Sequence, residues 1–298
     1  MKKVSLIWNI THACPWNCSF CCINAYYLPS SIKQLKIELN KIKRRGIELS
    51  LEDKLKIVNN LDIPNIELDV SGGEPLFFKE NVDIIAKLSK KFGRVNISIT
   101  TTSKGLNLVN LNILKRIVRE VGFTYDFPYK PDKLRPKGYN SSNLYSIKKV
   151  VKKGIKTMAQ IPLTKLNTNK KTITKIYENL AKVGVNRLLL MKFFPVGRGT
   201  NKTYLGLKDK EYKKAIESYK LLEQPNGPKI YIQTALKKDS INKNSNSLNI
   251  TSKGLLLSDP WAYDSYGKPI KKAILGDLKY KKLSDIIKFK YRKKFELQ

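Results

Sequence analysis

Residues 4–22 read VSLIWNITHACPWNCSFCC, in which an apolar segment runs directly into a cluster of cysteines. The segment Val4–Ile10 is short, apolar and rich in β-branched and aromatic residues, as buried parallel strands tend to be. Four cysteines then fall within nine positions, and the chain has no others: Cys14, Cys18, Cys21 and Cys22. The stretch therefore predicts a buried first strand whose exit carries a loop of thiols.

Strand-like and helix-like segments alternate along the chain as far as Glu223. After Val4–Ile10, five more segments are typical of buried strands: Ile66–Val70, Val95–Thr101, Gly122–Asp126, Thr157–Leu163 and Arg187–Phe194. Amphipathic segments separate or follow them: 50–61, which opens with the capping box Ser50-Leu-Glu-Asp53, and then Lys79–Phe92, Leu108–Val121, Ser142–Lys153, Thr172–Val183 and Lys208–Leu222. Six strand–helix units in succession predict parallel strands with right-handed crossovers. Six are too few to close an eight-fold barrel, so we expect an α/β fold, a partial (β/α)6 open barrel that binds ligands at the carboxyl ends of its strands.

The pattern changes after Glu223. We therefore expect a core, residues 1–223, and a small C-terminal extension, residues 224–298. The extension is expected to hold a short strand, a flexible polar loop KKDSINKNSNSLN, a second strand and a final helix: Lys229–Thr234, 237–249, Gly254–Leu257 and Leu283–Phe289.

The charge balance is strongly basic. The 298 residues include 58 lysines and arginines against 24 acidic residues, a formal net charge of +34. Such a field attracts anionic partners, among them RNA, nucleotides, acidic peptides and acidic lipids. A compositional bias towards lysine is the competing explanation.

The sequence gives no indication of a membrane protein. It has no run of eighteen apolar residues. The first apolar segment is interrupted by Asn9 and Thr11 and lacks a small-residue cleavage site, so we expect a cytoplasmic protein rather than a signal peptide.

The spacing of the cysteines limits what they can hold. A reducing compartment and strained geometry disfavour disulfides. Structural zinc takes four ligands, and here only His12 or Cys22 could be the fourth, while the neighbours Cys21 and Cys22 cannot easily face one ion. A cubane iron–sulfur cluster held by three thiolates would leave one iron without a protein ligand. An open metal position is typical of catalysis rather than of structure.

The stretch CPWNCSFC, residues 14–21, resembles the cluster loop of radical S-adenosylmethionine (radical SAM) enzymes, whose pattern is C-x3-C-x-aromatic-C. Phe20 stands at the aromatic position. The resemblance implies one 4Fe-4S cluster held by Cys14, Cys18 and Cys21, with S-adenosylmethionine (SAM) as the second cofactor. Cys22 lies outside the pattern. We expect an idle thiol there, with a hydrogen-atom donor as the alternative.

A second motif is consistent with the first. Asp69-Val-Ser-Gly-Gly-Glu-Pro-Leu76 ends the second expected strand and resembles the GGEP motif that binds the methionine amino group of SAM. Glycines allow close backbone approach and a carboxylate pairs with an ammonium. The resemblance implies cofactor contacts from Gly72, Gly73, Glu74 and Pro75. Less specific resemblances imply further SAM contacts. Thr102 or Ser103, together with Thr124, would contact the ribose, and Arg135 would contact the carboxylate. Gly197, in the stretch FPVGRG, would lie near the adenine.

The extension resembles the end of SPASM-type or twitch-type domains, which carry extra cysteines for auxiliary clusters. None follows Cys22 here, so we expect a degenerate form that keeps the packing without the metal.

Family resemblance implies an oxygen-sensitive enzyme that cleaves SAM reductively to a 5′-deoxyadenosyl radical, which abstracts a hydrogen atom from substrate. An external donor of the flavodoxin or ferredoxin type would supply the electron. We expect a peptide or protein substrate, as in the maturation of ribosomally made peptides. The alternatives are a nucleotide or RNA base, a small metabolite, or a non-catalytic metal protein that binds nucleic acid; the GGEP stretch argues against the last. No hydrogen donor or base is assigned, although four residues could line the barrel: Lys104, Tyr125, Tyr129 and Gln160.

Overall fold

The computed structural model describes residues 3–28, 32–133, 135–233, 236 and 247–287. Their dominant feature is one ten-stranded sheet with the order β12-β11-β10-β1-β4-β5-β6-β7-β8-β9. Six central strands pair in parallel with their neighbours in chain order: β1 (Val4–Thr11), β4 (Ile66–Gly72), β5 (Ile97–Thr101), β6 (Glu120–Thr124), β7 (Lys156–Leu163) and β8 (Arg187–Lys192). β12 and β9 are the two edges of this sheet, which therefore remains open. The α/β class and the open partial barrel are confirmed.

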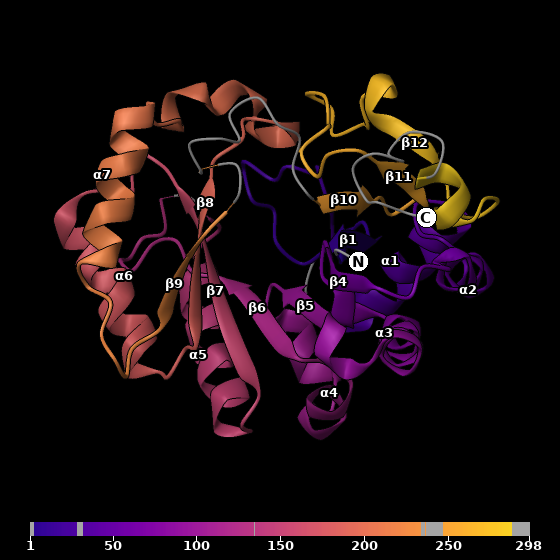
Figure 1. Ribbon diagram of the computed structural model, residues 1–298, viewed down its shortest axis with the longest axis horizontal. Coiled ribbons are helices and arrows are strands. Elements are labelled where there is room, and N and C mark those ends of the chain that lie inside the picture. Colours follow the sequence, from indigo (N-terminus) through magenta and orange to yellow (C-terminus); the bar gives the residue numbers. More distant parts are fainter. Residues whose placement is uncertain (1–2, 29–31, 134, 234–235, 237–246, 288–298) are drawn as a thin grey trace.

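Helices cover the outer, convex side of the curved sheet (Figure 1). They are α1 (Ile32–Arg44), α2 (Leu51–Asn60), α3 (Lys79–Phe92), α4 (Leu111–Ile117), α5 (Tyr139–Lys152), α6 (Lys170–Lys182) and α7 (Asp209–Lys220). The sequence did not indicate α1. α4 is shorter than the predicted segment Leu108–Val121, because Leu108 ends a preceding 3-10 helix and β6 already begins at Glu120.

The pleat of each strand divides its side chains between two environments, since successive residues point to opposite faces. From β1 and β4, the residues Leu6, Trp8, Leu68 and Val70 are buried in the core between sheet and helices. The intervening residues face the concave side: Ser5, Ile7 and Asn9 from β1, and Glu67, Asp69 and Ser71 from β4. The concave side is therefore polar where the convex side is apolar.

The chain after Glu223 contributes both edges of this sheet. β9 (Lys229–Ile232) pairs in parallel with β8, and β10 (Ser247–Ile250) pairs in parallel with β1. β11 (Leu255–Leu257) and β12 (Ile274–Asp277) continue antiparallel beyond β10, and residues 283–287 are helical. The predicted loop 237–249 is wrong at its end, since Ser247–Asn249 form part of β10. The rest of that loop, residues 237–246, lies outside the described residues. So do residue 234 of the predicted strand and residues 288–289 of the predicted helix. Leu248 is buried and anchors the pairing.

No helix among the described residues has the length and apolar character needed to cross a bilayer.

Candidate active site

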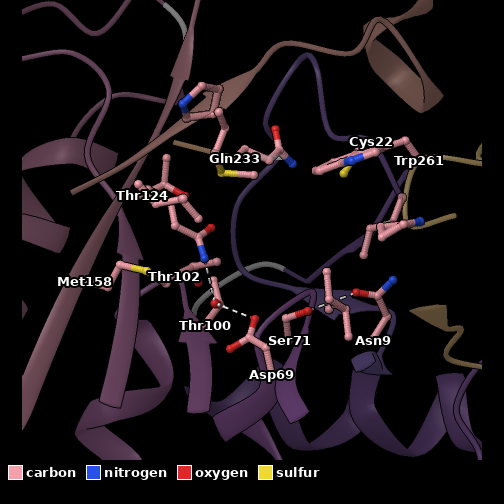
Figure 2. Close-up of a pocket in the computed structure, with 18 of the residues that line it drawn as sticks. Asn9, Cys22, Asp69, Ser71, Thr100, Thr102, Thr124, Met158, Gln233 and Trp261 are labelled. Carbon is pink, nitrogen blue, oxygen red and sulfur yellow. Dashed lines mark hydrogen bonds between the residues drawn. The ribbon is translucent and has the colours of Figure 1, made fainter. Parts of the chain in front are cut away.

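A cavity of about 560 Å³ occupies the concave side of the sheet (Figure 2). All four cysteines line it. So do Phe20, Gly72, Gly73, Thr102, Thr124 and Arg135, which the sequence assigned to one cofactor site. Four residues from the same assignment lie outside the lining: Glu74, Pro75, Ser103 and Gly197. These four support the site from behind, as the contacts below show.

The cysteine loop leaves β1 and is held by hydrogen bonds within the loop and to the exit of β5. Residues Ala13–Cys14 form β2, which pairs with β3 (Tyr26–Tyr27). The backbone amide of Ala25 donates to the Sγ atom of Cys21 at 3.4 Å, and Trp16 Nε1 donates to the carbonyl oxygen of Thr102 at 3.1 Å. The loop is thereby fixed to the exit of β5, with its thiols facing the cavity.

The thiols lie in a desolvated environment. Burial raises the pKa of the Cys14 and Cys18 thiols, and burial together with the neighbouring Cys21 raises the pKa of Cys22 to about 12. Arg135 donates to Cys18 and opposes the rise in its pKa. No group of three or more His, Cys, Asp or Glu side chains in the described part of the chain is arranged to hold a single metal ion. Three thiols beside an open cavity, with N–H donors directed at two of the sulfurs, fit a larger iron–sulfur cluster.

The turn after β4 packs directly on the cysteine loop. A Cβ atom on Gly73 would lie 2.0 Å from the carbonyl oxygen of Ala13, so only glycine fits there. The amides of Gly73 and Glu74 donate to the carbonyl oxygens of Thr11 and Ala13 at 2.9 and 2.7 Å. The exits of β1 and β4 therefore form one rigid edge beside the cysteines.

Glu74 is fully buried, and its carboxylate faces the exit of β5 instead of lining the cavity. It accepts hydrogen bonds from Thr101 Oγ1 at 2.8 Å, from the amide and Oγ1 of Thr102 at 2.9 and 2.7 Å, and from the amide of Leu76 at 3.2 Å. Burial raises its pKa, and these hydrogen bonds oppose the rise. In this structure Glu74 orients Thr102, which does line the cavity.

Arg135 joins the cysteine loop to β6. Its Nε and Nη2 atoms donate to Asp126 Oδ2 at 2.9 and 2.7 Å, and Asp126 is fully buried. The guanidinium lies between two rings, 4.3 Å from the centroid of Phe20 and 4.8 Å from that of Tyr139. This packing fixes Phe20, the aromatic residue of the cysteine pattern, against a cation beside Cys18.

Two further supports hold the cysteine loop, and the first, Glu48, was not indicated by the sequence. Its buried Oε1 atom accepts hydrogen bonds from Thr11 Oγ1 (2.7 Å), the His12 amide (2.6 Å) and the Ala13 amide (3.1 Å), just before Cys14. Lys54 Nζ lies 3.8 Å from Glu48 Oε2 and donates to Asn81 Oδ1, and Asn81 donates to the carbonyl oxygen of Pro75. Burial raises the pKa of Glu48 and lowers that of Lys54. No local pattern marks these residues, because their partners are distant in sequence.

The second support is the turn after β8. The amide of Arg198 donates to the carbonyl oxygen of Cys21 at 3.0 Å, and Arg198 Nη1 donates to that of Ala25 at 3.0 Å. Gly197 has a φ of +59°, and a Cβ atom there would lie 2.3 Å from the carbonyl oxygen of Cys22 and 2.5 Å from that of Cys21. The turn closes over the back of the cysteine loop.

Of the four possible lining residues that carried no assigned role, Gln160 lines the cavity. Tyr125 packs in the core and its hydroxyl accepts a hydrogen bond from Asn179, Lys104 lies 5.0 Å from the Trp16 ring, and Tyr129 packs on Phe127. Ser103 pairs its hydroxyl with that of Ser142, behind the lining.

Comparisons with known proteins agree with this geometry. Residues 8–180, more than half of the chain, match the family model of the radical SAM superfamily. The fold is similar to that of Streptococcus suis SuiB bound to S-adenosylmethionine, with 12% identity and a TM-score of 0.67 over 95% of this chain and 65% of that one. SuiB bound to precursor peptide SuiA is 12% identical, with a TM-score of 0.65 over 95% of this chain and 64% of that one. Native anSMEcpe with bound AdoMet and Cp18Cys peptide is 15% identical, with a TM-score of 0.64 over 96% of this chain and 80% of that one.

This chain thus spans slightly less than two thirds of the SuiB chains. At these identities the likeness shows the fold. None of the curated proteins compared with the sequence matches it.

Replacing Gly197 by alanine tests the turn over the cysteine loop. We expect the free energy of unfolding to fall by about 2 kcal/mol or more, because the new Cβ meets two backbone oxygens as well as an unfavourable φ. Gly46→Ala is the matched control, since its φ is +61° but no atom lies within 4 Å of the added Cβ. Equal losses for the two variants in urea unfolding would contradict the close contact.

The buried pair Glu48–Lys54 is expected to be strongly coupled. Glu48→Gln and Lys54→Met should each lower the free energy of unfolding by about 3 kcal/mol, since each leaves a buried partner uncompensated. The double variant should lose less than the sum. The exposed pair Glu52–Lys56 on the same helix is the control and should show little coupling in the same double-mutant cycle. Additive losses at Glu48 and Lys54 would refute the coupling.

Proposed function

This chain belongs to the radical SAM superfamily, and we therefore propose that it is an enzyme that uses one 4Fe-4S cluster and SAM to modify a peptide or protein by hydrogen-atom abstraction. The observation that carries the proposal is the meeting of two motifs at one cavity. The cysteine loop and the glycine turn come from different strands, yet Cys14, Cys18, Cys21, Gly72 and Gly73 line the same space.

The proposal assigns the cluster to Cys14, Cys18 and Cys21. When bound and reduced, the cluster supplies the electron that cleaves SAM to methionine and a 5′-deoxyadenosyl radical, which takes a hydrogen atom from the substrate. The residues of this chain hold and orient the reactants. Burial of Cys14 and Cys18 excludes water from the thiols, and Arg135 places a positive charge beside Cys18.

For SAM we propose the edge formed by Gly72 and Gly73, with Thr102 and Thr124 on one side and Arg135 on the other. Arg135 binds Asp126 through Nε and Nη2 and also donates to Cys18, and we propose that its remaining N–H groups bind the carboxylate of SAM. Glu74, Pro75, Ser103 and Gly197 are proposed to act by holding this edge, since their contacts lie behind the lining.

Two facts support a peptide or protein substrate. SuiB and anSMEcpe, which share the fold, have been solved with bound peptides. The cavity continues past the cysteine loop to Gln233, Asn249 and Trp261, which gives room for a side chain beside the cofactors.

The net charge of +34 favours an acidic flavodoxin-type or ferredoxin-type protein as the electron donor.

The experiment is anaerobic reconstitution of the full chain with iron and sulfide. The wild type should gain iron–sulfur absorbance and form 5′-deoxyadenosine from SAM with dithionite. Cys14→Ala, Cys18→Ala and Cys21→Ala should each abolish both signals, because each removes one of three cluster ligands. Cys22→Ala is the matched control and should keep both. A wild type that binds no cluster, or a Cys21→Ala variant that still forms 5′-deoxyadenosine at the wild-type rate, would refute the proposal.

A further inference from the structure

The two sides of the cavity differ in chemistry. Strands β1, β4 and β5 contribute polar groups, and Figure 2 shows Asn9, Ser71, Asp69 and Thr100 along this side. The facing strands β7 and β8 contribute four apolar side chains, Met158, Pro162, Leu189 and Met191, besides Gln160, Arg187 and Lys192. A group bound between them meets hydrogen-bonding atoms on one side and apolar surface on the other.

Asp69 is the carboxylate on the polar side. Its Oδ1 atom accepts a hydrogen bond from Ser98 Oγ at 2.8 Å, and its Oδ2 atom accepts one from Thr100 Oγ1 at 2.9 Å. Thr100 in turn accepts a hydrogen bond from Gln160 Nε2 at 3.0 Å. A carboxylate has room for about four donors, so half of the acceptor capacity of Asp69 is unused.

Two ion pairs lie beside Asp69, and Lys192 lines the cavity as well. Arg119 bonds to Glu67, and Arg187 bonds to Glu120. Each of these two guanidinium groups thus has a carboxylate partner, and neither forms an ion pair with Asp69. Within the described ranges, no cation lies within 4 Å of Asp69, and its partners are two neutral hydroxyls. Burial raises the pKa of Asp69, and an incoming cation would offset that cost.

The position of Asp69 along its strand suits a substrate anchor. It precedes Gly72 by three residues on β4, which is about 10 Å of extended strand. A group bound at Asp69 therefore lies below the proposed cofactor edge, and the atoms attached to it extend towards that edge.

We propose that Asp69 binds a cationic group of the substrate, a protonated amine or a guanidinium, whose aliphatic stem lies on Met158, Leu189 and Met191. For a peptide substrate this group is a basic side chain or the N-terminus. The inference rests on the proposed function only in taking this cavity as the substrate site. A protein of net charge +34 repels cations in general, so this one unpaired carboxylate decides which part of a substrate enters.

Two probes that differ in the charged group test the proposal: Nα-acetyl-L-lysine N-methylamide and Nα-acetyl-L-norleucine N-methylamide. Their binding to the reconstituted protein with SAM, without reductant, is measured by ligand-observed NMR titration. The wild type should bind the lysine probe at least tenfold more tightly. Asp69→Asn should bring the ratio of the two dissociation constants to within twofold of one.

Asp83→Asn is the matched control, because Asp83 is exposed on α3 and its substitution changes the net charge equally. It should keep the tenfold preference. Equal binding of the two probes by the wild type, no binding of either, or a preference that survives Asp69→Asn would overturn the proposal. A third probe, acetylated at Nε, would overturn it by binding as tightly as the lysine probe, since Asp69 would then accept from a neutral donor.

The outcomes separate this inference from the proposed function. Failure to form 5′-deoxyadenosine contradicts radical chemistry and leaves the comparison of probes readable, since binding requires no turnover. Loss of the charge preference overturns the role of Asp69 and leaves SAM cleavage untouched. If Asp69→Asn does not fold, as judged by circular dichroism, equal binding of the two probes by the wild type still overturns the proposal.

Discussion

The contact on which the site depends is the approach of Gly73 to the backbone of Ala13. A Cβ atom at Gly73 would lie 2.0 Å from the Ala13 carbonyl oxygen, and two backbone hydrogen bonds, from Gly73 and Glu74, fix the turn against β1 and the start of the cysteine loop. Glu74 then carries the connection into β5 through Thr101 and Thr102. The exits of three adjacent strands are thereby held as one unit. Cofactor geometry in such a site is set by backbone contact, which tolerates no additional atom, rather than by side chains that can rotate.

The pleat of the strands explains how a stable sheet can enclose a polar cavity. On β4, Leu68 and Val70 are buried against the helices, while Glu67, Asp69 and Ser71 face the concave side. The polar groups there are mostly satisfied by one another: Ser71 donates to Asn9, and Tyr263 donates to Asn249. Ion pairs close the floor of the cavity. The polar side of the cavity is thus largely hydrogen-bonded within itself, and Asp69, which accepts two hydrogen bonds, keeps unused acceptor capacity there.

The sequence was most informative where a signal is local. The period and composition of six strands predicted the open parallel sheet, and the two motifs located the cavity lining at Cys14 and Gly73. Long-range partners could not be predicted. β10 pairs with β1 across more than 240 residues, from Ser5 to Ser247, and Glu48 accepts a hydrogen bond from Thr11 across 37 residues. The polar residues of the stretch Ser247–Asn249 indicate a loop, yet this stretch forms a strand because it pairs with β1. Tertiary pairing here outweighs the low β-propensity of the sequence. The sequence assigned the carboxylate of Glu74 to a ligand, but in the structure it accepts hydrogen bonds from Thr101 and Thr102, which follow it by almost thirty positions.

The C-terminal segment contacts the cysteine loop and the cavity without contributing a cysteine. The amide of Gly197 donates to the carbonyl oxygen of Asp264, Asn24 donates to that of Tyr266, and the rings of Phe194 and Trp261 stack at 4.9 Å. Asn249 and Tyr263 extend the hydrogen-bond network of Asn9 into the same segment. A substitution in this segment therefore alters the shape of the cavity while leaving the backbone contact between Gly73 and Ala13 intact. The edge formed by β1, β4 and β5 and the segment after Glu223 thus contribute different walls of the same cavity.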